Sequence, residues 1–181
     1  MSSTILVTYG TKHGSTREVA EAVAQALKEQ GLDVETLAAA RVDDLEPYAG
    51  VVVGGAIYMG RWHPDAVEFL ERHRHALATL PVAIFGMGPR TMEEHDAEAS
   101  RQQLLKALAK VPDVVPRTVA VFGGVIDPDV LRFPLSRLPA SDARDWPAIR
   151  AWATELAGVF DYGKAAAQAR DHRSRLQQSP R

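Results

Sequence analysis

Cysteine is absent from the 181-residue sequence. Its absence excludes disulfide bonds, thiolate metal sites and cysteine nucleophiles, and it favours a cytoplasmic protein. The sequence also lacks any run of 18 consecutive apolar residues, which excludes a membrane-spanning helix of ordinary hydrophobicity. No basic segment precedes an apolar run near residue 1, so we expect no secretory signal.

A strong net charge is also absent, because the formal net charge is -2 at pH 7. This small value hides an uneven distribution. Residues 161–181 hold five basic and two acidic side chains, whereas the other 160 residues hold 16 basic and 21 acidic ones. An acidic body offers no basic surface to nucleic acid. We therefore expect one globular domain over residues 1–160 and a basic tail over residues 161–181, either a helical extension or disordered.

Short β-rich runs alternate with longer amphipathic stretches along the chain. The runs predict five strands, over residues 4–9, 33–37, 51–57, 82–86 and 118–122. The stretches predict four helices, over residues 15–30, 64–77, 97–110 and from residue 145 onward. Residues 51–57 have no polar face, which suits a central parallel strand. The alternation predicts an α/β protein whose parallel sheet is covered by helices on both faces.

The loop after the first predicted strand is the clearest candidate for a ligand site, because ligands in such folds lie outside the carboxyl ends of the strands. The loop contains hydroxyl groups and a glycine. It leads directly into a helix whose first backbone N–H groups have no intrahelical partners. We expect it to bind a phosphate group through Thr11, Lys12, His13, Gly14, Ser15 and Thr16. The alternative for any single hydroxyl is an ordinary N-terminal helix cap.

Two common nucleotide-binding loops do not match this segment. The dinucleotide fingerprint needs three glycines in the pattern G-x-G-x-x-G, but only Gly10 and Gly14 occur here. The P-loop pattern G-x-x-x-x-G-K-S/T is missing as well. The segment instead resembles the phosphate-binding loop of flavodoxins, at positions Val7, Thr8, Tyr9, Thr11, Gly14, Thr16, Ala20 and Val23. Thr8 stands where the flavodoxin pattern has an apolar residue.

The flavodoxin resemblance implies a three-layer sandwich with a five-stranded parallel sheet in the order 2-1-3-4-5, and FMN as the cofactor. Two more loops at the same edge then become candidates for contacts with the flavin ring. They supply the residues Ala56, Ile57, Tyr58, Gly60 and Trp62 after the third strand, and Met87, Gly88 and Pro89 after the fourth. We expect Tyr58 and Trp62 to stand at one wall of the ring site, and the Gly-Pro loop to present free backbone amides. The alternative for Trp62 is a core contact against the following helix.

The loop after the third strand is similar to that of the menaquinone-dependent protoporphyrinogen dehydrogenase branch of the flavodoxin superfamily. The shared residues are Gly55, Ala56, His63, Asp145 and Trp146. This resemblance implies an oxidoreductase that uses a quinone. The branch carries a long basic and aromatic insertion after the fifth strand, whereas 21 residues separate Gly124 from Trp146 here. Among them, residues 131–138 are a short apolar and basic stretch, a candidate for contact with a membrane surface or a quinone.

The sequence therefore predicts an FMN-binding redox protein, an oxidoreductase that passes electrons between a reduced substrate and a quinone or a similar acceptor. The cofactor supplies the chemistry, so we predict no catalytic side chain and no metal site. One alternative is a non-enzymatic electron-transfer flavodoxin that docks to a reductase. Another is a scaffold without a cofactor. The expected partners are an electron donor or acceptor protein, or a quinone.

Five basic or titratable side chains fall on the loops at the predicted ligand edge, namely Lys12, His13, Arg61, His63 and Arg90. A nearby positive charge stabilises an ionised, reduced ring. We therefore hypothesise a reduction potential less negative than that of acidic flavodoxin carriers. The alternative is that these side chains are solvated loop charges. His95 lies among acidic residues, where a polar helix start is a better interpretation than a cation site.

Overall fold

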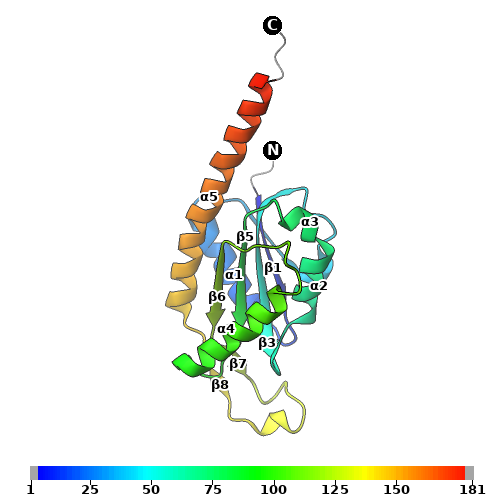
Figure 1. Ribbon diagram of the computed structural model, residues 1–181. Coiled ribbons are helices and arrows are strands. Elements are labelled where there is room, and N and C mark those ends of the chain that lie inside the picture. Colours follow the sequence, from blue (N-terminus) through cyan, green and yellow to red (C-terminus); the bar gives the residue numbers. More distant parts are fainter. Residues whose placement is uncertain (1–3, 178–181) are drawn as a thin grey trace.

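Five parallel strands form the central sheet, in the order β2-β1-β3-β5-β6 (Figure 1). The computed structural model describes residues 4–177, and residues 162–177 as backbone only. The strands are β1 (Thr4–Gly10), β2 (Val34–Ala38), β3 (Tyr48–Tyr58), β5 (Val82–Met87) and β6 (Thr118–Phe122). Counting only these five strands along the chain, the order is 2-1-3-4-5, so the predicted fold class is confirmed.

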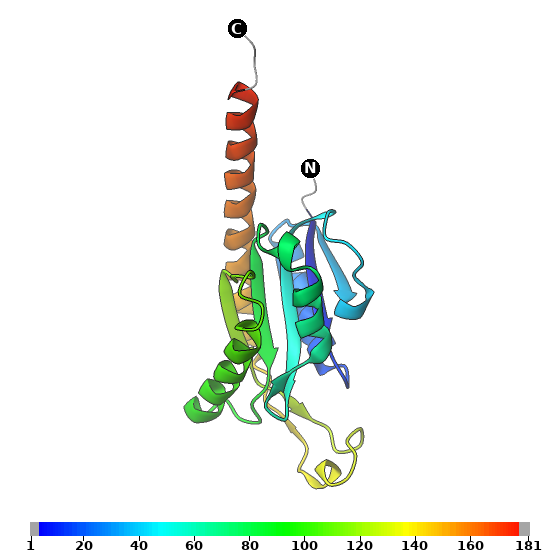
Figure 2. The same cartoon turned by 45° about the vertical axis from the view of Figure 1, so that its right-hand side comes forward.

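Helices cover both faces of the sheet and complete a three-layer arrangement (Figure 2). One face carries α1 (Ser15–Glu29) and α5 (Trp146–Gln177). The other carries α2 (Pro64–Arg72), α3 (Arg74–Leu77) and α4 (Glu94–Leu108). Two short 3-10 turns, η1 (Ala39–Arg41) and η2 (Leu135–Arg137), lie in the connections.

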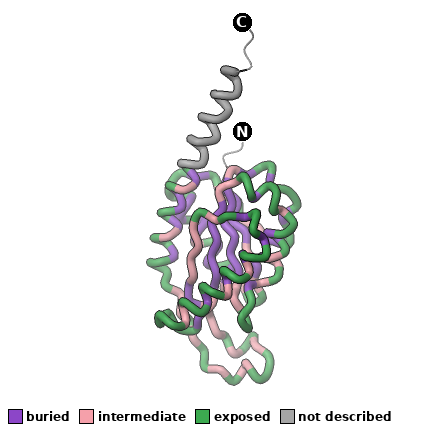
Figure 3. The backbone as a smooth tube through the Cα atoms, viewed as in Figure 1, coloured by how far each residue is buried: buried purple, intermediate pink, exposed green. Residues whose placement is uncertain are grey.

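Alternating side chains along β1 divide the hydrophobic core into two halves. Ile5 and Val7 pack on the side of α1 and α5, whereas Leu6 packs on the side of α2 and α4. All three are fully buried, and Figure 3 shows the buried strands enclosed by helices with exposed outer surfaces. Burial on both faces explains why the central strands read as continuous apolar runs.

Two of the predicted helices differ from the observed ones. The helix expected over residues 64–77 is broken at His73, whose φ of -104° and ψ of 13° leave the helical region. The His73 ring packs on Phe69 and its Nε2 lies 3.3 Å from the Val42 carbonyl oxygen, which holds the break in place. The helix expected over residues 97–110 begins at Glu94, because acidic groups in a first turn stabilise the positive end of a helix.

Two short antiparallel pairs extend the carboxyl edge of the sheet. Strand β4 (Arg61–Trp62) folds back on β3, and β7 (Val125–Ile126) pairs with β8 (Ser141–Asp142). Residues 125–142, here called the β7–β8 arm, project beyond the layers at this edge (Figures 1 and 2). The candidate phosphate loop, the β3–β4 hairpin and the arm therefore all lie at the same edge of the sheet.

Helix α5 continues through Gln177 and so includes part of the segment expected to be a basic tail. The side chains of residues 162–177 and the whole of residues 178–181 lie outside the described residues. Asp145 caps the start of the helix, since its Oδ1 accepts the N–H of Ala148 over 3.0 Å. Among the described residues, no helix combines the length and the apolar character needed to cross a membrane.

Candidate functional site

The loop between β1 and α1 has the geometry of an anion site. Gly14 is left-handed with φ 93°, and its N–H donates to Thr11 Oγ1 over 2.9 Å. The first helical hydrogen bond runs from the Glu18 N–H to the Gly14 carbonyl oxygen. Within the described residues no side chain caps α1. The N–H groups of its first turn are therefore open toward the loop, where the helix dipole favours a negative group.

One hydroxyl group in this first turn is buried without a partner. Thr16 is 0 % exposed, and its Oγ1 has no hydrogen-bond partner in the part of the chain that the structure describes. Leaving a buried hydroxyl unpaired costs roughly 1–3 kcal/mol. Ser15 is half-buried beside it, whereas Lys12 and His13 are exposed. The predicted loop residues thus meet at the start of α1, and they fit a phosphate group.

Strand β3 returns to β4 through a two-residue turn. Tyr58 pairs with Arg61, and Met59 (φ 50°) and Gly60 (φ 75°) between them are both left-handed, as in a type I′ turn. The turn leaves the Tyr58 ring exposed and Met59 76 % exposed. Lys12 Nζ lies 5.6 Å from the centre of the Tyr58 ring. The hairpin and the phosphate loop are therefore neighbours, as the sequence predicts.

Trp62 does not stand at an open wall of the site, which corrects the expectation from the sequence. The residue is 3 % exposed and belongs to the core on the side of α2 and α4. Its indole Nε1–H donates to the Gly55 carbonyl oxygen over 3.0 Å. A Cβ at residue 55 would lie 2.4 Å from the same nitrogen, so the ring needs glycine there. Trp62 therefore supports the hairpin from within the core, and Tyr58 is the exposed aromatic residue of this loop.

In the loop after β5, where the sequence led us to expect free backbone amides, neither Gly88 nor Pro89 offers one. The Gly88 N–H donates to the Phe122 carbonyl oxygen over 3.0 Å, and proline has no N–H. Met87 and Pro89 are both buried, and Met87 packs in the core. The physical reason is that hydrogen bonds tie this loop to the end of β6. The loop instead exposes Arg90.

A cavity of ≈ 270 Å³ lies between the β3–β4 turn, the loop after β5 and α4. It is lined by Ile57, Met59, Gly60, Gly88, Pro89, Arg90, Asp96, Ala99, Ser100 and Gln103. The last four belong to α4, whose sequence contains no binding motif. They reach the cavity because α4 packs against β4, so no local pattern could have revealed them. Met59 had a local signal, since a residue followed by glycine between two short strands is typical of a hairpin turn.

His63 ends the hairpin and begins α2. Its Nδ1 accepts the N–H of Asp65 over 3.3 Å and so caps the helix. Burial lowers the pKa of His63 below its ordinary 6.5. The Asp65 carboxylate acts in the opposite direction, and the positive charge of Lys12 adds to the lowering. The structure therefore favours a neutral imidazole at this position rather than a cation.

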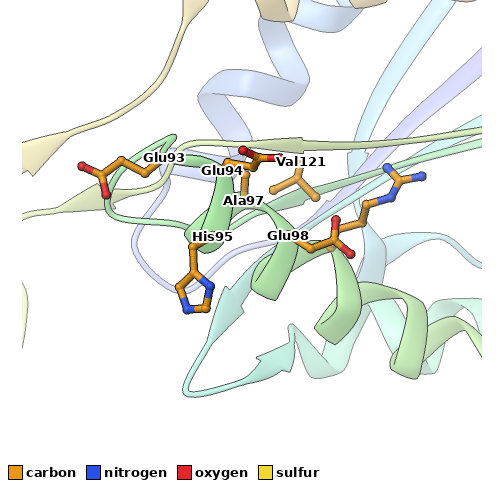
Figure 4. A pocket seen from close by; sticks show the side chains of 7 residues that line it. Glu93, Glu94, His95, Ala97, Glu98 and Val121 are labelled. Atoms are coloured by element: carbon orange, nitrogen blue, oxygen red, sulfur yellow. The ribbon is translucent and has the colours of Figure 1, made fainter.

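A larger hollow of ≈ 890 Å³ lies at the start of α4 beside Val121 of β6. Figure 4 shows the side chains of Glu93, His95 and Glu98 pointing in different directions around it. Residues 4–161 contain no group of three or more His, Cys, Asp or Glu side chains that could hold a metal ion. This hollow therefore lacks the convergent donors found at the phosphate loop, and we place the candidate site at that loop, the hairpin and the smaller cavity.

A family model for the flavodoxin domain matches residues 6–135. The chain belongs to the flavodoxin domain family. Protoporphyrinogen IX dehydrogenase (quinone) of Escherichia coli strain K12 is 32 % identical to this flavodoxin-domain protein over 84 residues, 45 % of this chain and 46 % of the relative. The protein of the same name from Escherichia coli O157:H7 matches with the same figures. The flavodoxin-domain protein thus spans less than half the length of the curated relatives it matches.

Solved flavodoxins share the fold of this flavodoxin-domain protein. A flavodoxin from Pseudomonas aeruginosa with a cysteine-to-alanine change has a TM-score of 0.57 at 18 % identity, over 87 % of this chain and 99 % of that one. The two-electron reduced flavodoxin of Megasphaera elsdenii has a TM-score of 0.56 at 16 % identity, over 85 % and 98 %. FMN is the cofactor that the flavodoxin domain family implies. The open first turn of α1 and the unpartnered Thr16 hydroxyl fit its phosphate group.

Proposed function

We propose that this flavodoxin-domain protein binds FMN at the carboxyl edge of its sheet and works as an oxidoreductase. Electrons pass from a reduced substrate to a quinone or a similar acceptor. The observation that carries this proposal is the first turn of α1, which has no side-chain cap among the described residues, with the left-handed Gly14 before it and the unpartnered Thr16 hydroxyl within it. These donors lie together in a single turn, which is what a phosphate group requires.

The chain offers a different set of residues to each part of FMN. Residues 11–16 would hold the phosphate, with the Thr11 hydroxyl oxygen fixing the Gly14 N–H in place. Tyr58 and Met59 on the hairpin, together with the ≈ 270 Å³ cavity beside them, would hold the ring. When bound, FMN supplies the electron-transfer chemistry. The protein positions the cofactor and sets the charge around it.

Two observations support a quinone as the acceptor. The curated relatives, matched over less than half of their length, have the word quinone in their names. Apolar side chains are also exposed at the edge where FMN would bind, since Met59 is 76 % and Phe133 of the arm 71 % exposed. The guanidinium of Arg137 lies 4.9 Å from the centre of the Phe133 ring. This apolar and basic arm suits peripheral contact with a membrane surface. The proposed location of the protein is the cytoplasm.

A non-enzymatic electron carrier is the second candidate function. The carboxylates of Glu93, Glu94 and Glu98 surround the hollow at the start of α4 (Figure 4). Such an acidic surface suits the docking of a reductase with a basic face, because complementary charges steer association. A carrier would accept electrons from that reductase and would not turn over a small substrate.

The first experiment tests cofactor binding. Protein freed of cofactor is titrated with FMN and, separately, with riboflavin, and the quenching of flavin fluorescence is measured. Two charge-assisted hydrogen bonds to the phosphate contribute roughly 3 kcal/mol, so FMN should bind about a hundredfold more tightly than riboflavin. Equal affinities, or no binding of FMN, would contradict the proposed phosphate site.

The second experiment separates the enzyme from the carrier. The FMN-loaded protein is assayed without oxygen, with protoporphyrinogen as the reduced substrate and menadione as the quinone. A parallel assay supplies NADPH and a flavodoxin reductase. Turnover of porphyrinogen and menadione supports the oxidoreductase. Reduction by the reductase without turnover of either small molecule supports the carrier.

A further inference from the structure

We infer that Arg90 raises the reduction potential of bound FMN by placing an unpaired positive charge beside the ring. The inference rests on the proposed FMN site and deepens it, because it names the side chain that sets how readily the site accepts electrons. Arg90 lines the ≈ 270 Å³ cavity between the β3–β4 turn and the loop after β5. The proposed function assigns this cavity to the ring.

The backbone that carries Arg90 is anchored to the neighbouring strand. The Gly88 N–H donates to the Phe122 carbonyl oxygen over 3.0 Å. The Pro89 carbonyl oxygen accepts the N–H of Gly124 over 2.9 Å, and Pro89 is buried. The exposed side chain of Arg90 therefore extends from a fixed backbone position in the lining of the cavity.

The charge of Arg90 is not neutralised by a carboxylate. Arg90 forms no ion pair with any side chain that the structure describes. Asp96 is the acidic residue that shares the cavity, and its Oδ2 accepts a hydrogen bond from the Thr91 hydroxyl over 2.6 Å. The cavity is thus lined by one arginine and one carboxylate that form no ion pair with each other, so the guanidinium is free to interact with a ligand.

The other basic side chains of these loops do not line this cavity. Lys12 Nζ lies over the Tyr58 ring at 5.6 Å from its centre. Burial lowers the pKa of His63, which favours its uncharged form. His13 and Arg61 are exposed and line neither of the two hollows described above. Among the described residues, Arg90 is therefore the one basic side chain that lines the cavity.

The chemistry of reduction makes that charge matter. Uptake of two electrons and one proton adds one negative charge to the ring, and a guanidinium beside the ring stabilises this charge. Reduced FMN should then bind more tightly than oxidised FMN, and by thermodynamic linkage the midpoint potential rises. For a two-electron couple, a tenfold difference in binding corresponds to about 30 mV.

The test compares Arg90→Gln with Arg117→Gln in the FMN-loaded protein. Arg117 is exposed and precedes β6 at the opposite edge of the sheet, so its loss changes the net charge equally but far from the site. Midpoint potentials are measured by anaerobic titration with dithionite, together with the Kd of oxidised and of reduced FMN. We expect Arg90→Gln to weaken the binding of reduced FMN about tenfold more than that of oxidised FMN, and to lower the potential by about 30 mV. Arg90→Lys keeps the charge and should restore most of the potential, while Arg117→Gln should leave it unchanged.

Two results would overturn the role of Arg90. One is a midpoint potential that Arg90→Gln leaves unchanged. The other is an equal loss of affinity for oxidised and reduced FMN, which indicates that Arg90 only shapes the loop. A wild-type protein that fails to bind FMN contradicts the proposed function itself. Normal binding of FMN with an unchanged potential in Arg90→Gln contradicts the role of Arg90 alone.

Discussion

Gly10 at the end of β1 packs against His63 at the start of α2. A Cβ at residue 10 would lie 2.7 Å from His63 Nδ1 and 3.2 Å from the backbone nitrogen of Ala66. The same Nδ1 accepts the N–H of Asp65 and caps α2. This contact joins β1, which leads into the phosphate loop, to α2, which follows the β3–β4 hairpin. A substitution at either residue should therefore disturb both the phosphate loop and the hairpin.

Gly10→Ala should destabilise the protein and weaken FMN binding. The added methyl group must displace the imidazole or the α2 backbone, at a cost of about 1–3 kcal/mol in the free energy of unfolding. Urea unfolding and an FMN titration would measure the two effects. Gly158→Ala is the matched control, because it lies exposed in α5 and its added Cβ meets no described atom within 4 Å beyond its chain neighbours and the nearby backbone of its own helix. It should gain about 0.5–1 kcal/mol; equal effects at both glycines would argue against the contact with His63.

The stability of the protein should depend on pH through His63. Burial lowers the pKa of His63 in the folded state below 6.5; the Asp65 carboxylate partly opposes this shift, and the positive charge of Lys12 adds to it. The unfolded chain therefore binds a proton at His63 more readily than the folded chain does. This contribution is fully present above pH 6.5 and is lost as the pH falls through the folded-state pKa. Burial also lowers the pKa of His73, which adds a dependence of the same sign.

Urea unfolding at several pH values between about 5 and 8 would measure this dependence. His63→Gln should reduce its slope, and the remaining slope should disappear in a double variant that also carries His73→Gln. A slope that His63→Gln leaves intact would show that His63 titrates alike in the folded and unfolded chains.

Two buried threonines without hydrogen-bond partners among the described residues form a matched pair. Thr8 lies in β1 and Thr16 in the first turn of α1, and both are 0 % exposed. Valine has nearly the same shape, so neither Thr8→Val nor Thr16→Val should lower the stability of the cofactor-free protein. Thr16→Val should weaken FMN binding about tenfold or more, since it removes a hydrogen bond to a charged group. Thr8→Val should not change it, and unchanged FMN affinity in both variants would remove Thr16 from the phosphate site.

Arg144 connects the β7–β8 arm to α1. Its guanidinium pairs with Glu18 of α1 and with Asp142 of β8, and the Arg144 side chain is 11 % exposed. Arg144→Gln should lower the free energy of unfolding by about 1 kcal/mol, and hydrogen exchange should become faster in the arm. The exposed pair of Arg150 and Glu29 supplies the control. Arg150→Gln should cost no more than about 0.5 kcal/mol and leave exchange in the arm unchanged. Unchanged exchange in Arg144→Gln would show that the arm is held by other contacts.

The ion pair between Arg144 and Asp142 should also make the stability of the protein depend on pH in the acid range. The hydrogen bond from Arg144 lowers the pKa of Asp142 below its ordinary 3.8. The resulting stabilisation is present above pH 3.8 and is lost as the pH falls through the lower folded-state pKa. NMR titration of the Asp142 carboxyl carbon, with and without Arg144→Gln, would measure the shift. In the variant the pKa should return toward 3.8, and no return would contradict this cause.

The candidate phosphate loop could be predicted from the sequence because its parts are consecutive residues. A strand, a hydroxyl- and glycine-rich loop and a helix start follow one another between Thr4 and Glu18, so no distant contact is needed to bring the donors together. The same holds for the alternating strands and helices, whose apolar periodicity is local. Even the left-handed turn at Gly14 lies within this stretch.

The ring loops were predicted less well, because access depends on partners far away in the chain. Trp62 follows an exposed turn, yet its indole packs inward beneath Gly55. The Gly88 N–H donates its hydrogen bond to the carbonyl oxygen of Phe122, which lies on another strand. A local pattern shows that an aromatic ring or an amide is present at an edge, but not whether another element covers it.

By itself the sequence determined the α/β class and the covered parallel sheet, and it predicted which residues of the loop after β1 would meet a phosphate, because each follows from residues that are neighbours in the chain. Only the tertiary structure decided which side chains are free to meet a ligand. Lys12 lies over Tyr58, and Arg90 lines a cavity without a paired carboxylate among the described residues. Burial and charge pairing arise from the packing of distant segments, so no spacing along the chain can encode them alone.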